Sequence, residues 1–174
     1  MSDEPLLDRE RLHELFRRLG ERLQRRGVLG DVYVIGGAAM ALAYDARRAT
    51  RDVDAVYVPH GIVQQEAHAL AAEEGLPRWW LNEQASAYMA PGGDPTAAVS
   101  FDHPGLRVST ASPEHLLAMK ALASRRRDAD DLRLLIERLG LRSVDEVVEV
   151  CERVFPRERL PDRARLLLED LFAE

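Results

Sequence analysis

The stretch VIGGAAMALAYDARRATRDVDAVYV, residues 34–58, decides how this 174-residue chain folds. It continues a β-rich run at 31–35 into the glycine pair Gly36–Gly37, and the residues at 38–44 are strong helix formers. After a polar loop, residues 51–58 alternate between polar and apolar side chains, which is typical of a strand with one buried face. The stretch therefore predicts a strand, a glycine turn, a helix and a second strand, in this order.

Two carboxylates two residues apart give this stretch its chemistry. Residues i and i+2 of a strand point to the same face, so we expect Asp52 and Asp54 to project together. Adjacent carboxylates repel each other, and a divalent cation such as Mg²⁺ or Mn²⁺ removes that cost by binding their oxygens. Mg²⁺ is usually shared with substrate phosphates, which the backbone N–H groups of Gly36 and Gly37 can approach closely. Either feature alone is commonly structural, but their order and spacing favour a site for phosphoryl or nucleotidyl transfer.

The sequence on both sides of this stretch predicts more helices and strands. Leucines at helical spacing indicate an amphipathic N-terminal helix, and capping residues mark helices in the second half. The expected helices are 6–26, 38–44, 61–74 and those that begin after Ser112, at Asp128 or Ala129, after Ser143 and after Pro161. The expected strands are 31–35, 51–58, 96–101 and 106–109, with 78–81 open between a strand and a turn. This order favours an α/β fold in which a small mixed β-sheet is flanked by helices and followed by a helical C-terminal part.

The composition narrows the class of protein. Hydrophobic residues make up 46% of the chain and charged residues 31%, which is ordinary for a globular domain. The single cysteine, Cys151, excludes an intrachain disulfide, and the net charge of -6 argues against a general nucleic-acid binder. The chain has neither a signal-peptide pattern nor a run of ~18 apolar residues, so we expect a cytoplasmic protein without a membrane partner.

Two segments of the chain resemble the nucleotidyltransferase superfamily, which has the DNA polymerase β-like fold. The run at 34–58 is most similar to the AbiEii branch, which includes the MenT toxins. Those proteins have a glycine pair followed by R-x-T-x-D-[IV]-D, and Arg48–Asp54 reads RATRDVD. They also have L-x-A-x-K-x-x-A, then arginines and D-x-x-D-[LI], which residues 116–123 and 127–132 match.

This resemblance covers about residues 28–139. It implies a single nucleotidyltransferase-like domain over 1–174, with a core at about 28–139 and a helical C-terminal extension at about 140–174. It also implies a metal-dependent transferase that uses a nucleotide triphosphate as substrate and Mg²⁺ or Mn²⁺ as cofactor.

The resemblance gives roles to the residues around the glycine turn. Gly36–Gly37 would contact the triphosphate, and Asp52 and Asp54 would bind the metal and carry the catalysis. Arg48 and Thr50 would brace the loop or touch a phosphate.

In the second half of the chain the resemblance points to one lysine and its acidic neighbours. Lys120 would contact nucleotide phosphates, and Asp131, together with Asp128, would hold Lys120 or act near the site. The alternatives are a solvated surface lysine and acids that complement a helix N-terminus. Asp102 is a candidate third carboxylate, although we expect it to belong to the turn at 103–105.

The expected activity is transfer of a nucleoside monophosphate from an NTP to an acceptor, with release of pyrophosphate. By resemblance, the acceptor is the 3′ end of a tRNA, and the protein is the toxin of a toxin–antitoxin system with an antitoxin protein as partner. One alternative is a catalytically inactive nucleotidyltransferase-like protein that binds nucleotides as an antitoxin, regulator or sensor. Another is a nucleotidyltransferase that modifies a small molecule, such as an antibiotic, or a protein.

Overall fold

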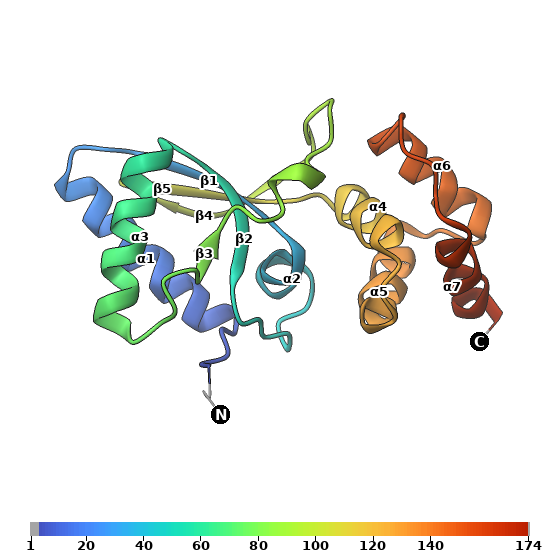
Figure 1. Cartoon of the computed structure of the whole chain (residues 1–174), viewed down its shortest axis with the longest axis horizontal. Coiled ribbons are helices and arrows are strands. Elements are labelled where there is room, and N and C mark those ends of the chain that lie inside the picture. The colour runs from blue at the N-terminus through green and yellow to red at the C-terminus, as the bar shows by residue number, and fades with distance from the viewer. Residues whose placement is uncertain (1–3, 174) are drawn as a thin grey trace. The chain divides into compact units, whose positions relative to one another are not determined.

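The computed structural model describes residues 4–173, which form two compact units (Figure 1). The first, here called the sheet unit, comprises the residues up to Ala87 together with Ala97–Ala111. The second, here called the helical unit, comprises Tyr88–Thr96 and the residues from Ser112 onward. The predicted single domain over 1–174 stays a prediction. Along the chain, the two units alternate after Ala87, at Ala97 and after Ala111.

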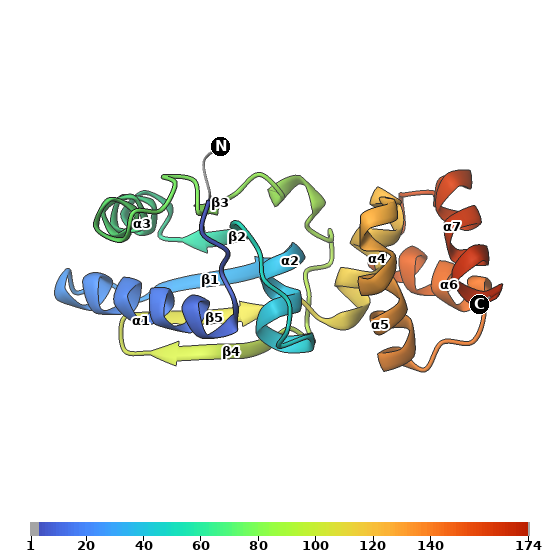
Figure 2. The same ribbon diagram turned by 90° about the horizontal axis from the view of Figure 1, so that it is seen from below.

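The sheet unit is built on a five-stranded mixed β-sheet, which confirms the expected α/β class. The strands are β1 (Gly30–Ile35), β2 (Val53–Val58), β3 (Leu81–Asn82), β4 (Ala98–His103) and β5 (Leu106–Thr110). Their order is β3-β2-β1-β5-β4, and Figure 2 shows β1 between β2 and β5. β1 is antiparallel to β2 and parallel to β5, β3 is parallel to β2, and β4 is antiparallel to β5.

Two helices cover one face of this sheet because alternate strand residues are apolar. α1 (Arg9–Arg25) packs on β4 and β5, and α3 (His60–Glu74) packs on β2 and on α1. The side chains buried on this face include Val32, Val34, Val53, Ala55, Tyr57, Leu106 and Val108. Residues in the intervening positions face the opposite side, where Tyr33, Asp54 and Val56 are half-buried and Asp31 and Val58 are exposed. The face that carries Asp54 is therefore the less covered one.

The glycine pair starts the short helix α2 (Gly36–Ala39), which continues as a π-helical turn, η1 (Met40–Tyr44). The alanines of this helix and the Met40 and Leu42 side chains are buried, which explains why small helix formers dominate the segment. The polar loop that follows returns the chain to β2. Its residue Thr50 forms an isolated bridge with Leu7, whose backbone N–H donates to the Thr50 carbonyl at 2.7 Å.

The helical unit confirms the helices expected in the second half of the chain. It contains α4 (Pro113–Ala123), the 3₁₀ turn η3 (Arg126–Asp128), α5 (Ala129–Leu139), α6 (Val144–Val154) and α7 (Asp162–Ala173). The hydroxyls of Ser112 and Ser143 cap α4 and α6 by accepting backbone N–H bonds from His115 and Glu146. A further 3₁₀ turn, η2 (Ser86–Tyr88), leads into the unit.

Three details differ from the expected elements. β2 starts at Val53, so Asp52 lies in the bend before the strand. The segment left open at 78–81 is mostly a turn, and only Leu81 belongs to a strand. The placement of Asp102 in a turn is wrong, because β4 continues to His103. Among residues 4–173, no helix has the length and apolar character needed to span a bilayer.

Candidate functional site

The glycine turn lies beside the carboxylate of Asp54, one of the predicted site residues. Gly36 has a φ of +67°, and a Cβ atom at this position would lie 3.4 Å from Asp54 Oδ2. A Cβ atom on Gly37 would lie 3.3 Å from Thr50 Oγ1. Gly36 has a left-handed backbone and neither glycine has a side chain. The turn from β1 to α2 can therefore lie close to Asp54 and Thr50.

The two aspartates reach the same face of the sheet, although only one of them is in a strand. Asp54 pairs with Ile35 of β1 and with Asn82 of β3, and paired residues have their side chains on the same face. The side-chain amide of Asn82 donates to Asp52 Oδ2 at 3.0 Å. The structure therefore brings Asp52 and Asp54 together around Asn82.

The loop before Asp52 is held by its own residues. The Thr50 hydroxyl donates to the Asp52 backbone carbonyl at 3.0 Å, and the predicted bracing role of Thr50 stays a prediction. Earlier in the loop, the backbone N–H of Arg47 donates to Asp45 Oδ1 at 3.0 Å and lowers the pKa of that carboxyl. Arg48 is half-buried in the same loop, and its predicted role at a phosphate stays a prediction.

Asn82 is a site residue that the sequence analysis missed. Its strand, β3, is two residues long, which is too short for any alternation to show. Its position beside Asp52 depends on parallel pairing with β2, which is a long-range contact that the local sequence does not encode.

In the helical unit, Lys120 lies between two carboxylates. Its Nζ atom is 3.0 Å from Asp128 Oδ1 and 2.9 Å from Asp131 Oδ2. The exposed fractions of these side chains are 10% for Lys120, 13% for Asp128 and 4% for Asp131. The alternative of a solvated lysine is therefore wrong, and Asp128 and Asp131 hold Lys120 as expected. Its contact with nucleotide phosphates stays a prediction.

Asp102 lies at the other end of the sheet from Asp54. It pairs with Arg107, which in turn pairs with Asp31, and its side chain is 65% exposed. On β1, Asp31 marks the level of Asp102, and Ile35, which pairs with Asp54, marks the level of Asp54. These two positions are four residues apart, which is about 13 Å along a strand. Asp102 is thus too far along the sheet to be a third carboxylate of this site. Within residues 4–173, no group of three or more His, Cys, Asp or Glu side chains is placed to hold a metal.

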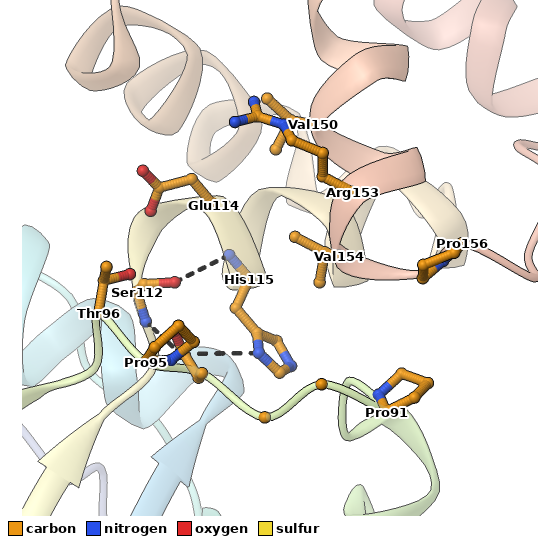
Figure 3. Close-up of a pocket in the computed structure, with 13 residues that line it drawn as sticks. Pro91, Pro95, Thr96, Ser112, Glu114, His115, Val150, Arg153, Val154 and Pro156 are labelled. Atoms are coloured by element: carbon orange, nitrogen blue, oxygen red, sulfur yellow. Dashed lines mark hydrogen bonds and ion pairs between the residues drawn. The ribbon is translucent and has the colours of Figure 1, made fainter.

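The helical unit also contains a pocket of about 410 Å³ between the loop at 91–96, the start of α4 and the end of α6 (Figure 3). Buried Asp94 accepts the Ser112 backbone N–H at 2.7 Å, and its Oδ2 atom is 3.6 Å from His115 Nδ1. Burial lowers the pKa of His115, so the ring is neutral at pH 7. None of the predicted site residues lines this pocket, and its polar groups fasten the loop to α4.

Comparison with known proteins gives one family match and one distantly similar solved structure. Residues 10–163 match the model of a family described as "nucleotidyltransferase of unknown function (DUF6036)". No curated protein matches the chain. Among solved structures, an antigenic nucleotidyltransferase-like protein from Paracoccidioides brasiliensis is similar at 17% identity and a TM-score of 0.49, over 97% of this chain and 90% of that chain.

Proposed function

This chain belongs to the family of nucleotidyltransferases of unknown function, and on that premise we propose that it transfers a nucleoside monophosphate from an NTP to an acceptor hydroxyl. The observation that carries the proposal is the contact of the Gly36 turn with Asp54, beside an Asp52 carboxylate held by Asn82. In the proposed reaction the acceptor oxygen forms a bond to the α-phosphorus and its hydroxyl proton is released to the solvent. The bond between the α-phosphorus and the bridging oxygen breaks, and pyrophosphate leaves.

The donor set at this turn fits a hard divalent cation. Proteins bind Mg²⁺ through one or two carboxylates, and substrate phosphates complete its coordination. Asp52 and Asp54 supply these two carboxylates and would hold the ion. When bound, Mg²⁺ or Mn²⁺ supplies a positive charge that orients the triphosphate and offsets the charge developing on it. The backbone of Gly36–Gly37, which carries no side chains of its own, would approach the phosphates.

We further propose that the acceptor is the 3′ end of a tRNA and that the protein is the toxin of a toxin–antitoxin pair. The support is the match of Arg48–Asp54 and of residues 116–132 to the AbiEii pattern. In addition, three exposed arginines lie in the chain just before Asp128, namely Arg125, Arg126 and Arg127. They adjoin Lys120, Asp128 and Asp131, here called the Lys120 cluster, and can contact RNA phosphates. Lys120 and Asp131 would act at the phosphates of the bound nucleotide.

A labelling assay tests this function. Purified protein is incubated with Mg²⁺, each of the four α-³²P-labelled NTPs in turn, and total tRNA. Transfer of label to tRNA that stops when EDTA removes the metal is the expected result. Label that goes instead to a protein or a small molecule would overturn the proposed acceptor and keep the proposed reaction.

A second candidate function is nucleotide binding without catalysis. It is favoured by the location of Asp102, which leaves the site with two carboxylates and no third acid among the described residues. Calorimetry separates the two functions, because an NTP that binds but labels no acceptor supports a sensor or regulator.

The positive φ of Gly36 gives a matched pair of variants. Gly36→Ala and Gly27→Ala both place a side chain in left-handed backbone, at φ +67° and +68°, so each is expected to lower the free energy of unfolding by about 1–2 kcal/mol. Only the Gly36 methyl group would contact Asp54, since nothing lies within 4 Å of a Cβ atom on Gly27. We therefore expect Gly36→Ala alone to weaken Mn²⁺ binding. Urea unfolding and a Mn²⁺ titration measure the two effects, and equal Mn²⁺ affinities would contradict the contact.

A further inference from the structure

Asn82 is held at every polar atom of its side chain. Its Nδ2 atom donates to Asp52 Oδ2 at 3.0 Å and to the Trp79 carbonyl at 3.1 Å. Its Oδ1 atom accepts the backbone N–H of Gln84 at 3.1 Å. The residue is 9% exposed, so these bonds replace nearly all of its contacts with water.

This set of partners determines which way the amide points. Turning the amide over would put Oδ1 against the Asp52 carboxylate and the Trp79 carbonyl, and would face the NH₂ group toward the Gln84 N–H. Each of these contacts would be repulsive, because it would pair acceptor with acceptor or donor with donor. The Trp79 carbonyl and the Gln84 N–H therefore hold the amide in the orientation in which its NH₂ group donates to Asp52.

The strand that carries Asn82 is fixed in place by its buried neighbour. Trp80 is fully buried, and its Nε1 atom donates to the Ala67 carbonyl of α3 at 2.9 Å. The Trp80 carbonyl accepts the backbone N–H of Val53 at 2.6 Å, at the residue between the two aspartates. The segment that carries Asn82 is therefore hydrogen-bonded to the backbone between Asp52 and Asp54.

We propose that Asn82 is a positioning residue for the metal site. Its amide fixes the rotation of the Asp52 carboxylate through Oδ2, which leaves Oδ1 for the divalent cation. This inference rests on the proposed function, because it assigns Asn82 a role only if Asp52 is a metal ligand. Groups that orient a metal ligand in this way typically change metal affinity about 10–100-fold when they are removed.

Affinity for Mn²⁺ tests the role directly. The free Mn²⁺ concentration is followed by electron paramagnetic resonance in wild type, Asn82→Ala, Asp52→Ala, Asp54→Ala and the double variant of Asn82→Ala with Asp52→Ala. Asn82→Ala is expected to weaken Mn²⁺ binding about tenfold or more. In the Asp52→Ala background the same change is expected to add almost nothing, since it acts through the missing carboxylate. Gln84→Ala is the matched control, because Gln84 contacts Asn82 through its backbone and its side chain is exposed.

A second measurement needs no variant at position 82. Asn82 is the only asparagine of the chain, so protein labelled with ¹⁵N-asparagine has one side-chain amide signal. We expect Mn²⁺ to broaden this signal strongly in the wild type, and Asp52→Ala to shift it and to remove the broadening. This measurement decides the matter if Asn82→Ala does not fold.

The outcomes separate the inference from the proposed function. If wild type binds Mn²⁺ no better than Asp52→Ala and Asp54→Ala, the metal site itself is absent and the proposed function fails. If wild type binds Mn²⁺ through the two aspartates while Asn82→Ala keeps its affinity within about twofold, the proposed function stands and the role of Asn82 is overturned. An amide signal that Asp52→Ala leaves unshifted would overturn it as well.

Discussion

Asp54→Asn is expected to reduce nucleotidyl transfer by about 10²–10³-fold or more, because it removes a charged metal ligand and the transition-state charge stabilisation that depends on it. The amide has nearly the volume of the carboxylate, so the fold is expected to persist. Rates come from the labelling assay at saturating Mg²⁺, and stability from urea unfolding.

Asp31→Asn is the matched control for this variant. Asp31 lies on the same face of the sheet, at the opposite end of the pairing between β1 and β2, and it is exposed. Activity of this control should equal that of the wild type. If the Asp54→Asn variant still transfers nucleotide at the wild-type rate, the assignment of Asp54 as a metal ligand is contradicted. The labelling assay could still show that the wild type is a nucleotidyltransferase.

Lys120→Met should give the largest loss of stability among the variants considered. The change removes the cation from between Asp128 and Asp131 and leaves two nearly buried carboxylates facing each other. Removing one partner of a buried ion pair typically costs about 3–5 kcal/mol, because the remaining charge stays buried without compensation. Urea unfolding at pH 7 measures the loss, and Lys120→Met combined with Asp131→Asn should recover part of it.

A solvated ion pair on α5 is the control for Lys120. Arg133 Nη1 is 3.1 Å from Asp130 Oδ1, with exposed fractions of 44% and 88%. Arg133→Met should therefore cost no more than about 1 kcal/mol. A similarly small loss for Lys120→Met would mean that the Lys120 cluster contributes little to the fold. In that case any loss of activity in the variant would reflect contact with substrate rather than stability.

The sequence predicted the elements around the glycine turn well because their signals are local. Alternation from residue 51 to 58 identified β2, and the glycine pair identified the turn into α2. The argument that Asp52 and Asp54 share a face because both lie in one strand was wrong in its reason. Asp52 precedes the strand, and its direction is set by Asn82 and by the loop rather than by the pleat of β2.

What could not be predicted depends on contacts between distant residues. The sequence His103–Pro104–Gly105 has the composition of a turn, yet β4 continues to His103, so only Pro104 and Gly105 make the turn. A Cβ atom on Gly105 would lie 1.9 Å from the Gly20 carbonyl oxygen of α1, so packing against that helix fixes where the chain reverses. The pairing of Lys120 with Asp128 and Asp131 was expected only from the family resemblance, because it depends on how η3 returns the chain to α4.

The two units are interleaved along the chain, and this has a consequence for how the protein can be divided or recombined. The polypeptide leaves the sheet unit after Ala87, returns at Ala97 and leaves again after Ala111. An exchange of gene segments at Ala111 would keep Asp94 but replace Ser112 and His115, which contact it. No single breakpoint separates the two units whole, because a cut after Ala87 takes Ala97–Ala111 from the sheet unit and a cut after Ala111 takes Tyr88–Thr96 from the helical unit.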